Sequence, residues 1–200
     1  KFDSVHAVGF DYGQTHKIEL EMARVIAQNA GVQYKVFDVK NLLAGSSLTN
    51  KTDHNKASEI NPDLPASFTA GRNLLFMAIA GSYAAGLKIN DIVTGVCQTD
   101  YSGYPDCRKA TMTAVELSLS LGLGAGDMRI HTPLMYLTKA ETWKLAAELG
   151  IVDIIRNQTM TDYNGDMTPN SWGMGKLDNP ASVLRAKGHA EALEKGWLNL

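Results

Sequence analysis

Short apolar segments alternate with helical patterns along this chain, and this alternation limits the fold more than any other feature of the sequence. Strands are expected at residues 5–10, 34–39, 91–96 and 129–132. Helices are expected at residues 16–30, 71–87, 110–121, 138–149 and 184–194. Strands that alternate with helices are typical of a parallel sheet with helices on both faces, so the sequence predicts an α/β fold.

Several helix ends carry recognisable capping residues. Thr15 is expected to cap the first helix and Gly31 to end it, because glycine tolerates the left-handed conformation after a last turn. Thr138 and Glu141 have the spacing of a capping box. The helix at 71–87 is dominated by small and apolar residues, including Leu74, and is therefore expected to be deeply buried.

A fifteen-residue connection, residues 94–108, follows the third expected strand. It contains two carboxylates, two phenols, a serine hydroxyl, an arginine and two thiols, and Gly103 and Pro105 fix its bends. Ordinary connections in such domains run about 2–6 residues. Ligands of open α/β sheets bind at the carboxyl ends of strands. The loop is therefore interpreted as a site for a small, polar, planar molecule, and a solvated surface loop is the alternative.

Three further segments are candidates for binding a nucleotide. Arg72 and Asn73 follow Gly71 at a helix start, which favours a phosphate group, although an Arg–carboxylate pair that fixes a loop has the same pattern. Residues 10–14 end the first strand with a glycine and an aromatic side chain suited to an adenine pocket, or simply precede a helix cap. Lys139 lies in a first helical turn, where its positive charge is unfavourable beside the positive end of the helix dipole. Either a nearby phosphate or a solvated pair with a glutamate would offset that charge.

Composition excludes several classes of protein. The 200 residues are 44% hydrophobic with a net charge of −2, which suits one compact domain and gives no general field for nucleic acid or a membrane surface. Cys97 and Cys107 are expected to be reduced thiols in a cytoplasmic protein. The five histidines lack metal-ligand spacing, so no metal site is predicted. Residues 1–156 are expected to form the α/β part and residues 157–200 an irregular and helical tail of the same domain.

Motifs spread over residues 4–193 resemble the 7-cyano-7-deazaguanine synthase family of PP-loop ATP pyrophosphatases. The segments that carry the resemblance are FDYGQ (10–14), SSLT (46–49), GRN (71–73), TGVCQTDYSGYPDCR (94–108), TPL (132–134), KAETW (139–143), RN (156–157) and YNG (163–165). The resemblance implies a Rossmann-like, adenine nucleotide α-hydrolase-like fold. Because residues 10–14, 97–108 and 132–137 each follow the carboxyl end of an expected strand, we expect them to gather at one sheet edge. The resemblance also implies ATP with Mg²⁺ as cofactors, and ligation of ammonia to 7-carboxy-7-deazaguanine to give a nitrile in queuosine-type biosynthesis.

The resemblance also assigns residues to roles. It implies that ATP is bound by Phe10, Asp11, Tyr12, Gly13, Gln14, Gly71, Arg72, Thr94 and Gly95. It implies that the deazaguanine is bound by Asp100, Tyr101, Ser102, Gly103, Tyr104, Asp106 and Arg108. Arg72, Asn73 and Lys139 are the expected catalytic residues. An aspartate suits the guanidine-like N–H pair of such a base, because a carboxylate accepts two hydrogen bonds.

The chain departs from the family pattern in two places. The family's first strand and Ser-Gly-Gly-x-Asp-Ser phosphate loop do not occur in this sequence, so we expect an open central strand position and inefficient ATP hydrolysis by the chain as written. Relatives also carry four zinc-binding cysteines, the first just before Tyr-Asn-Gly and the last just before Leu-Arg. Asp162 and Ser182 stand at those ends here, and residues 166–183 contain no Cys or His. The tail is therefore expected to be ordered without zinc.

Two other functions fit the same residues. One is a PP-loop enzyme that activates a related deazapurine acid for a different acceptor, and the other is a non-catalytic deazapurine-binding homologue. The small-molecule substrate and ammonium are the expected partners, with no membrane and no direct nucleic-acid contact, and a homodimer is left open.

Overall fold

The structure, a computed structural model, describes residues 2–43, 46–49, 56–58, 60–99, 103–124 and 126–198. The chain divides into two compact units, a first unit of Lys1–Ser67 with Thr138–Leu200 and a second unit of Phe68–Leu137. Each unit has its own pair of parallel strands. The boundary expected at residue 156 falls inside the first unit, within helix α5 (Val152–Gln158), and remains a prediction.

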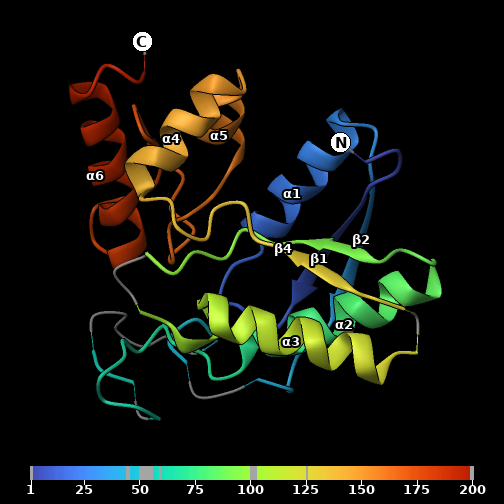
Figure 1. Cartoon of the computed structure of the whole chain (residues 1–200). Coiled ribbons are helices and arrows are strands. Elements are labelled where there is room, and N and C mark those ends of the chain that lie inside the picture. The colour runs from blue at the N-terminus through green and yellow to red at the C-terminus, as the bar shows by residue number, and fades with distance from the viewer. Residues whose placement is uncertain are drawn as a thin grey trace. The chain divides into compact units, whose positions relative to one another are not determined.

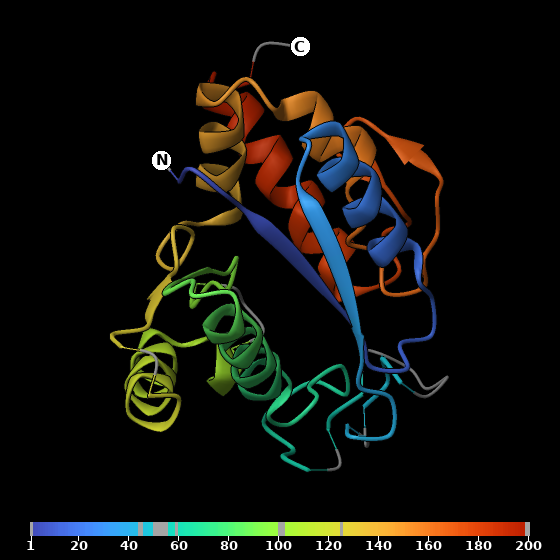
Figure 2. The same cartoon turned by 90° about the vertical axis from the view of Figure 1, so that its right-hand side faces the viewer.

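The first unit begins with a strand–helix–strand motif. β1 (His6–Asp11) and β2 (Gln33–Asp38) pair in parallel from His6 opposite Gln33 to Asp11 opposite Asp38. Helix α1 (Ile18–Asn29) makes the crossover that parallel strands require, and Figure 2 shows it beside the two strands. The expected strands and helix are confirmed. The expected cap is wrong, because Lys17 precedes the helix without a side-chain cap and the Thr15 amide instead donates to the carbonyl of Leu48 at 3.0 Å.

Two packed helices form the hydrophobic centre of the first unit's carboxyl-terminal half. α4 (Lys139–Glu148) lies along α6 (Pro180–Glu194), as Figure 1 shows. Ala140, Trp143, Ala192 and Leu198 are buried in their core. The capping box is confirmed, since Thr138 Oγ1 accepts from the Glu141 amide and Glu141 Oε2 accepts from the Thr138 amide.

The tail is more regular than the sequence predicts. β5 (Pro169–Asn170) and β6 (Gly173–Met174) form a short antiparallel pair. Helix α6 starts four residues before the expected position. Asn179 caps it by accepting a hydrogen bond from the Ser182 amide at 3.1 Å, and Pro180 stands in the first turn, where its missing N–H costs nothing.

The second unit contains α2 (Arg72–Gly86), β3 (Asp91–Val93), the short 3₁₀ helix η1 (Pro105–Cys107), α3 (Lys109–Gly122) and β4 (Arg129–His131). β3 and β4 are parallel, with Ile92 opposite Ile130. Gly81 lets α2 pack closely on α3, because a Cβ there would lie 2.9 Å from the Leu119 methyl groups. Burial of α2 is one-sided, so the prediction of deep burial is wrong for Leu74, which is 42% exposed.

The strands of the described residues form three separate two-stranded sheets, β1–β2, β3–β4 and β5–β6. The expected α/β class with parallel strands is therefore confirmed. A single Rossmann-like sheet with helices on both faces, and an open strand position within it, remain predictions. No helix in the described part of the chain is long and apolar enough to cross a membrane.

Candidate functional site

The residue before helix α2 is a glycine in a conformation that other residues avoid. Gly71 has φ of +71°, which is left-handed, and it offers no side chain to cap the helix. The Arg72 amide donates to the carbonyl of Thr69 at 3.1 Å. The next amide, that of Asn73, donates to Asp106 Oδ2 at 3.0 Å. A carboxylate from the 94–108 loop thus takes the position of a capping side chain at the start of α2.

Asp106 is held in place by the 3₁₀ helix that contains it. The Cys107 amide donates to the Tyr104 carbonyl at 3.1 Å, and Thr111 Oγ1 donates to the Pro105 carbonyl at 2.7 Å. Asn73 Nδ2 also donates to Cys107 Sγ at 3.2 Å. Asp106 is only 6% exposed. The loop and the helix start are therefore joined by the backbone and the side chain of Asn73 together.

This geometry changes the interpretation of the helix start as a phosphate site. A negative charge is favourable there because the helix dipole and the unpaired amides attract it. The Asp106 carboxylate already supplies that charge and occupies the Asn73 amide. A phosphate at this helix start would have to use Arg72 and the remaining amides.

The rest of the 94–108 loop is only partly within the described residues. Asp100, Tyr101 and Ser102, predicted to bind substrate, lie outside them. The ring of Tyr104 packs against Phe68 with 5.7 Å between centroids. Arg108 donates to the carbonyl of Gly103 at 3.3 Å, which closes the turn before η1.

The start of the same loop joins the segment that follows β4. The Thr94 amide donates to the His131 carbonyl at 3.0 Å, and the Gln98 amide donates to the Met135 carbonyl at 3.0 Å. Thr99 Oγ1 donates to the Leu137 carbonyl at 2.5 Å. Residues 97–99 thus lie beside residues 132–137, which is part of the expected gathering of 97–108 with 132–137, and the place of residues 10–14 beside them remains a prediction.

The sequence did not predict the hydrogen bonds that Gln98 and Thr99 make with neighbouring segments. Gln98 Oε1 accepts from the Lys109 amide at 3.1 Å, at the start of α3. Their position directly after the expected strand was the available signal, since polar residues at a strand's carboxyl end are the ones that can reach a neighbouring loop.

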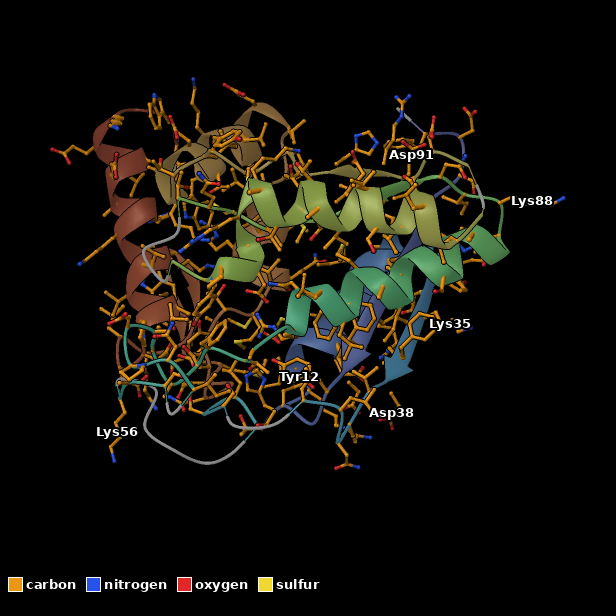
Figure 3. All side chains as sticks on the ribbon, turned by 60° about the horizontal axis from the view of Figure 1, so that its bottom comes forward. Tyr12, Lys35, Asp38, Lys56, Lys88 and Asp91 are labelled. Carbon is orange, nitrogen blue, oxygen red and sulfur yellow. The ribbon has the colours of Figure 1, made fainter. Side chains whose placement is uncertain are left out.

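The predicted nucleotide segment, residues 10–14, lies in the first unit at the carboxyl end of β1. Gly13 has φ of +83°, and its amide donates to Asp11 Oδ1 at 3.2 Å. The Tyr12 amide donates to Gln14 Oε1 at 3.0 Å, so side chains of the segment support its own turn. Figure 3 shows Tyr12 and Asp38 at the carboxyl ends of the two parallel strands.

Asp11 is the most strongly paired group of this segment. It is 7% exposed, and its Oδ2 lies 2.6 Å from Lys17 Nζ and 3.1 Å from Lys40 Nζ. Burial alone would raise the pKa of Asp11, but the hydrogen bonds from Lys17 and Lys40 outweigh it and hold the pKa below its ordinary value. Neither lysine was predicted, because Lys40 reaches Asp11 only through the pairing of β1 with β2.

Lys139 lies in the first unit at the first residue of α4. Its Cβ packs where a side chain on Gly188 would otherwise stand, so the stem of Lys139 is fixed between α4 and α6. Among the described residues, no three His, Cys, Asp or Glu side chains are grouped so that they could hold a metal ion.

Two comparisons with known proteins cover nearly the whole chain. The family model described as "Queuosine biosynthesis protein QueC" matches residues 1–193. A 7-cyano-7-deazaguanine synthase from Phocaeicola vulgatus is 47% identical over 197 residues, a match that covers 96% of this chain and 85% of that protein.

Proposed function

The chain belongs to the QueC family of queuosine biosynthesis proteins, and on that basis we propose that it is a 7-cyano-7-deazaguanine synthase, an ATP-dependent ligase. The observation that carries this proposal is the 47% identity to a synthase over 96% of the chain. Such a match includes every segment on which the resemblance in the sequence rests, from residues 10–14 to 163–165.

The reaction begins with an acid that is a poor acyl donor, because its leaving group would be oxide. The carboxylate of 7-carboxy-7-deazaguanine attacks the α-phosphorus of ATP, and pyrophosphate leaves. Ammonia then attacks the acyl carbon, AMP leaves and a proton is lost, which gives the amide. The amide oxygen then attacks the α-phosphorus of a second ATP and pyrophosphate leaves. Departure of AMP, which carries that oxygen away, and loss of two protons form the nitrile.

The protein's part in this chemistry is to position groups and to stabilise charge. We assign Arg72 to the phosphate or acyl-adenylate, because a guanidinium binds such oxygens in a bidentate manner. Asp106 is a positioning residue in this assignment, since it holds the Asn73 backbone at the start of α2. Tyr104 and Arg108, with Asp100, Tyr101, Ser102 and Gly103, are assigned to the deazaguanine.

Residues 10–14 are assigned to the nucleotide, and the family resemblance gives the same role to Gly71, Thr94 and Gly95. The left-handed turn at Gly13 supports this assignment, because it lets the backbone approach a ligand without a side chain in the way. Lys139 is assigned to the phosphates, and Mg²⁺ enters with ATP, since phosphates supply much of its coordination. A Rossmann-like fold of the adenine nucleotide α-hydrolase type and a cytoplasmic location belong to the same proposal.

Product mass tests the proposal directly. The protein encoded by the complete coding region is incubated with 7-carboxy-7-deazaguanine, ammonium and ATP with Mg²⁺, and the purine product is identified by mass spectrometry. We expect the nitrile, with the amide as an earlier species and with AMP and pyrophosphate as coproducts. Omission of ammonium and the Arg72→Ala variant are the controls, and both should stop nitrile formation. A product joined to another acceptor, or binding of the acid without turnover, would contradict the proposal.

A further inference from the structure

A single carboxylate oxygen in the tail of the first unit gathers three hydrogen-bond donors. Asp162 is completely buried, and its Oδ2 accepts from the Lys176 amide at 3.0 Å, from Asn179 Nδ2 at 2.8 Å and from Ser182 Oγ at 2.9 Å. Its other oxygen, Oδ1, accepts from the amides of Asn164 at 2.8 Å and Asp166 at 3.3 Å. Five donors thus surround one buried side chain.

The spacing of these residues is that of a structural metal site. Residues 176, 179 and 182 follow one another at intervals of three, and residue 162 comes from a separate turn. Structural zinc sites use closely spaced ligands of this kind together with ligands from elsewhere in the chain. Asp162 and Ser182 also stand at the two ends of the segment in which family members carry zinc-binding cysteines.

Zinc does not fit the residues that this chain has there. Structural zinc sites are closed by four Cys or His ligands, and the cluster offers one carboxylate, one amide, one hydroxyl and a backbone N–H. The last three point their hydrogens at the same oxygen, so they leave no room for a cation between them. Residues 157–188 contain no Cys and no His.

We propose that Asp162 replaces the metal ion as the centre of this site and that its buried carboxylate holds the tail together without zinc. The arrangement reverses the charges of a zinc site: an anion lies at the centre and uncharged donors surround it. Gly175 makes the close approach possible, because it has φ of +127° and a Cβ there would lie 2.7 Å from Asp162 Oδ2. The donors come from the turn after residue 162, from residue 176 and from the start of α6, so one side chain joins three segments.

The energetics support a central role for this carboxylate. Burial of a charge is costly unless hydrogen bonds replace the lost water. Burial alone would raise the pKa of Asp162, but the hydrogen bonds from Lys176, Ser182, Asn164 and Asn179 outweigh it and hold the pKa below its ordinary value. The carboxylate is therefore ionised at neutral pH and fully supplied with donors.

Thermal unfolding and metal analysis test the proposal together. The purified protein should contain well under one zinc per chain, and a chelator should leave its melting temperature unchanged. Asp162→Ala should lower the melting temperature by roughly 5 °C or more, and Asp162→Asn should also lower it, because the amide group cannot accept from all five donors. Asp153→Asn, which removes an exposed carboxylate of the same unit, is the matched control and should change it little. Stoichiometric zinc, or equal effects of Asp162→Asn and Asp153→Asn, would overturn the proposal.

A second variant tests whether the same four positions converge closely enough to bind zinc when they carry cysteines. The quadruple change Asp162→Cys, Lys176→Cys, Asn179→Cys and Ser182→Cys puts a thiol at Asp162 and at the three residues that donate to its Oδ2, of which Lys176 donates with its backbone amide. It should bind one zinc per chain, and a chelator should then lower its melting temperature. The control, with Asp153 and three exposed tail residues changed to Cys, should bind none. Failure of the quadruple variant to take up zinc would show that the four positions do not converge.

Discussion

Asp106 Oδ2 lies 3.0 Å from the backbone nitrogen of Asn73, although 33 positions separate the two residues in the sequence. This hydrogen bond joins the start of α2 to the loop predicted to bind the substrate. It also supplies the negative charge that a helix start attracts, in place of the cap that Gly71 cannot provide.

Substitution of Asp106 separates its positioning role from a direct contact with substrate. Asp106→Ala should lower the free energy of unfolding by about 1–2 kcal/mol, because the Asn73 amide loses its acceptor. Asp106→Asn keeps an oxygen that can accept the same bond and should recover most of the stability and of the KM for 7-carboxy-7-deazaguanine. If Asp106→Asn is stable but binds the acid as poorly as Asp106→Ala does, the charge of Asp106 is needed by the substrate itself.

Gly188→Ala should destabilise the packing of α4 against α6. A Cβ at Gly188 would overlap Lys139 Cβ and would lie 2.8 Å from the Lys139 carbonyl carbon, so the two helices would have to move apart. We expect a loss of about 1–3 kcal/mol in denaturant unfolding. Gly122→Ala is the control, because nothing lies within 4 Å of a Cβ there, and it should be neutral or stabilising. Equal effects of the two variants would contradict the close approach of the helices.

Acid should weaken the first unit through Asp11. Its pKa is lowered in the folded protein, so its contribution to stability is complete above the ordinary value of 3.8 and is lost as the pH falls through the lower folded value. Asp11→Asn should be less stable than the unmodified protein at pH 7, and the difference should narrow toward pH 2. Asp38→Asn removes an exposed carboxylate that pairs with the same Lys40, and it should change stability much less than Asp11→Asn does. A difference that does not depend on pH would exclude the ion pairs as its cause.

His189 should make the protein less stable in mild acid. The residue is 2% exposed, and its ring packs edge-on to that of Trp143 with 5.0 Å between centroids. Burial, together with the charges of Arg156 and Arg185, lowers the pKa of His189. The folded state therefore favours the neutral imidazole. The stability that His189 contributes above the ordinary pKa of 6.5 is lost as the pH falls through its lower pKa in the folded protein. His189→Phe removes this titration and should give a flatter stability profile between pH 7 and pH 5. Parallel profiles for the two proteins would show that His189 does not titrate in this range.

The sequence alone determined the features that depend on neighbouring residues. The strands β1 and β2, helix α3 and the capping box of Thr138 with Glu141 follow from periodicity and from spacings of at most four positions, which local sequence records directly. The order of the motifs from residues 10–14 to 163–165 was also enough to indicate the family. The predicted cap at Thr15 was wrong because local sequence does not reveal distant partners: the Thr15 amide donates to the carbonyl of Leu48, 33 positions away.

Only the tertiary structure decided which groups meet across long stretches of chain. Three contacts join residues that are 20 or more positions apart: Asp106 with Asn73, Asp11 with Lys40, and Asp162 with Ser182. Periodicity gives the face on which a side chain lies but not the element that packs there, so it cannot say whether a carboxylate binds a ligand or the protein's own backbone. The cost of burial decides between the two: a buried carboxylate is stable only when hydrogen-bond donors surround it. The tertiary fold determines which donors lie close enough to do so.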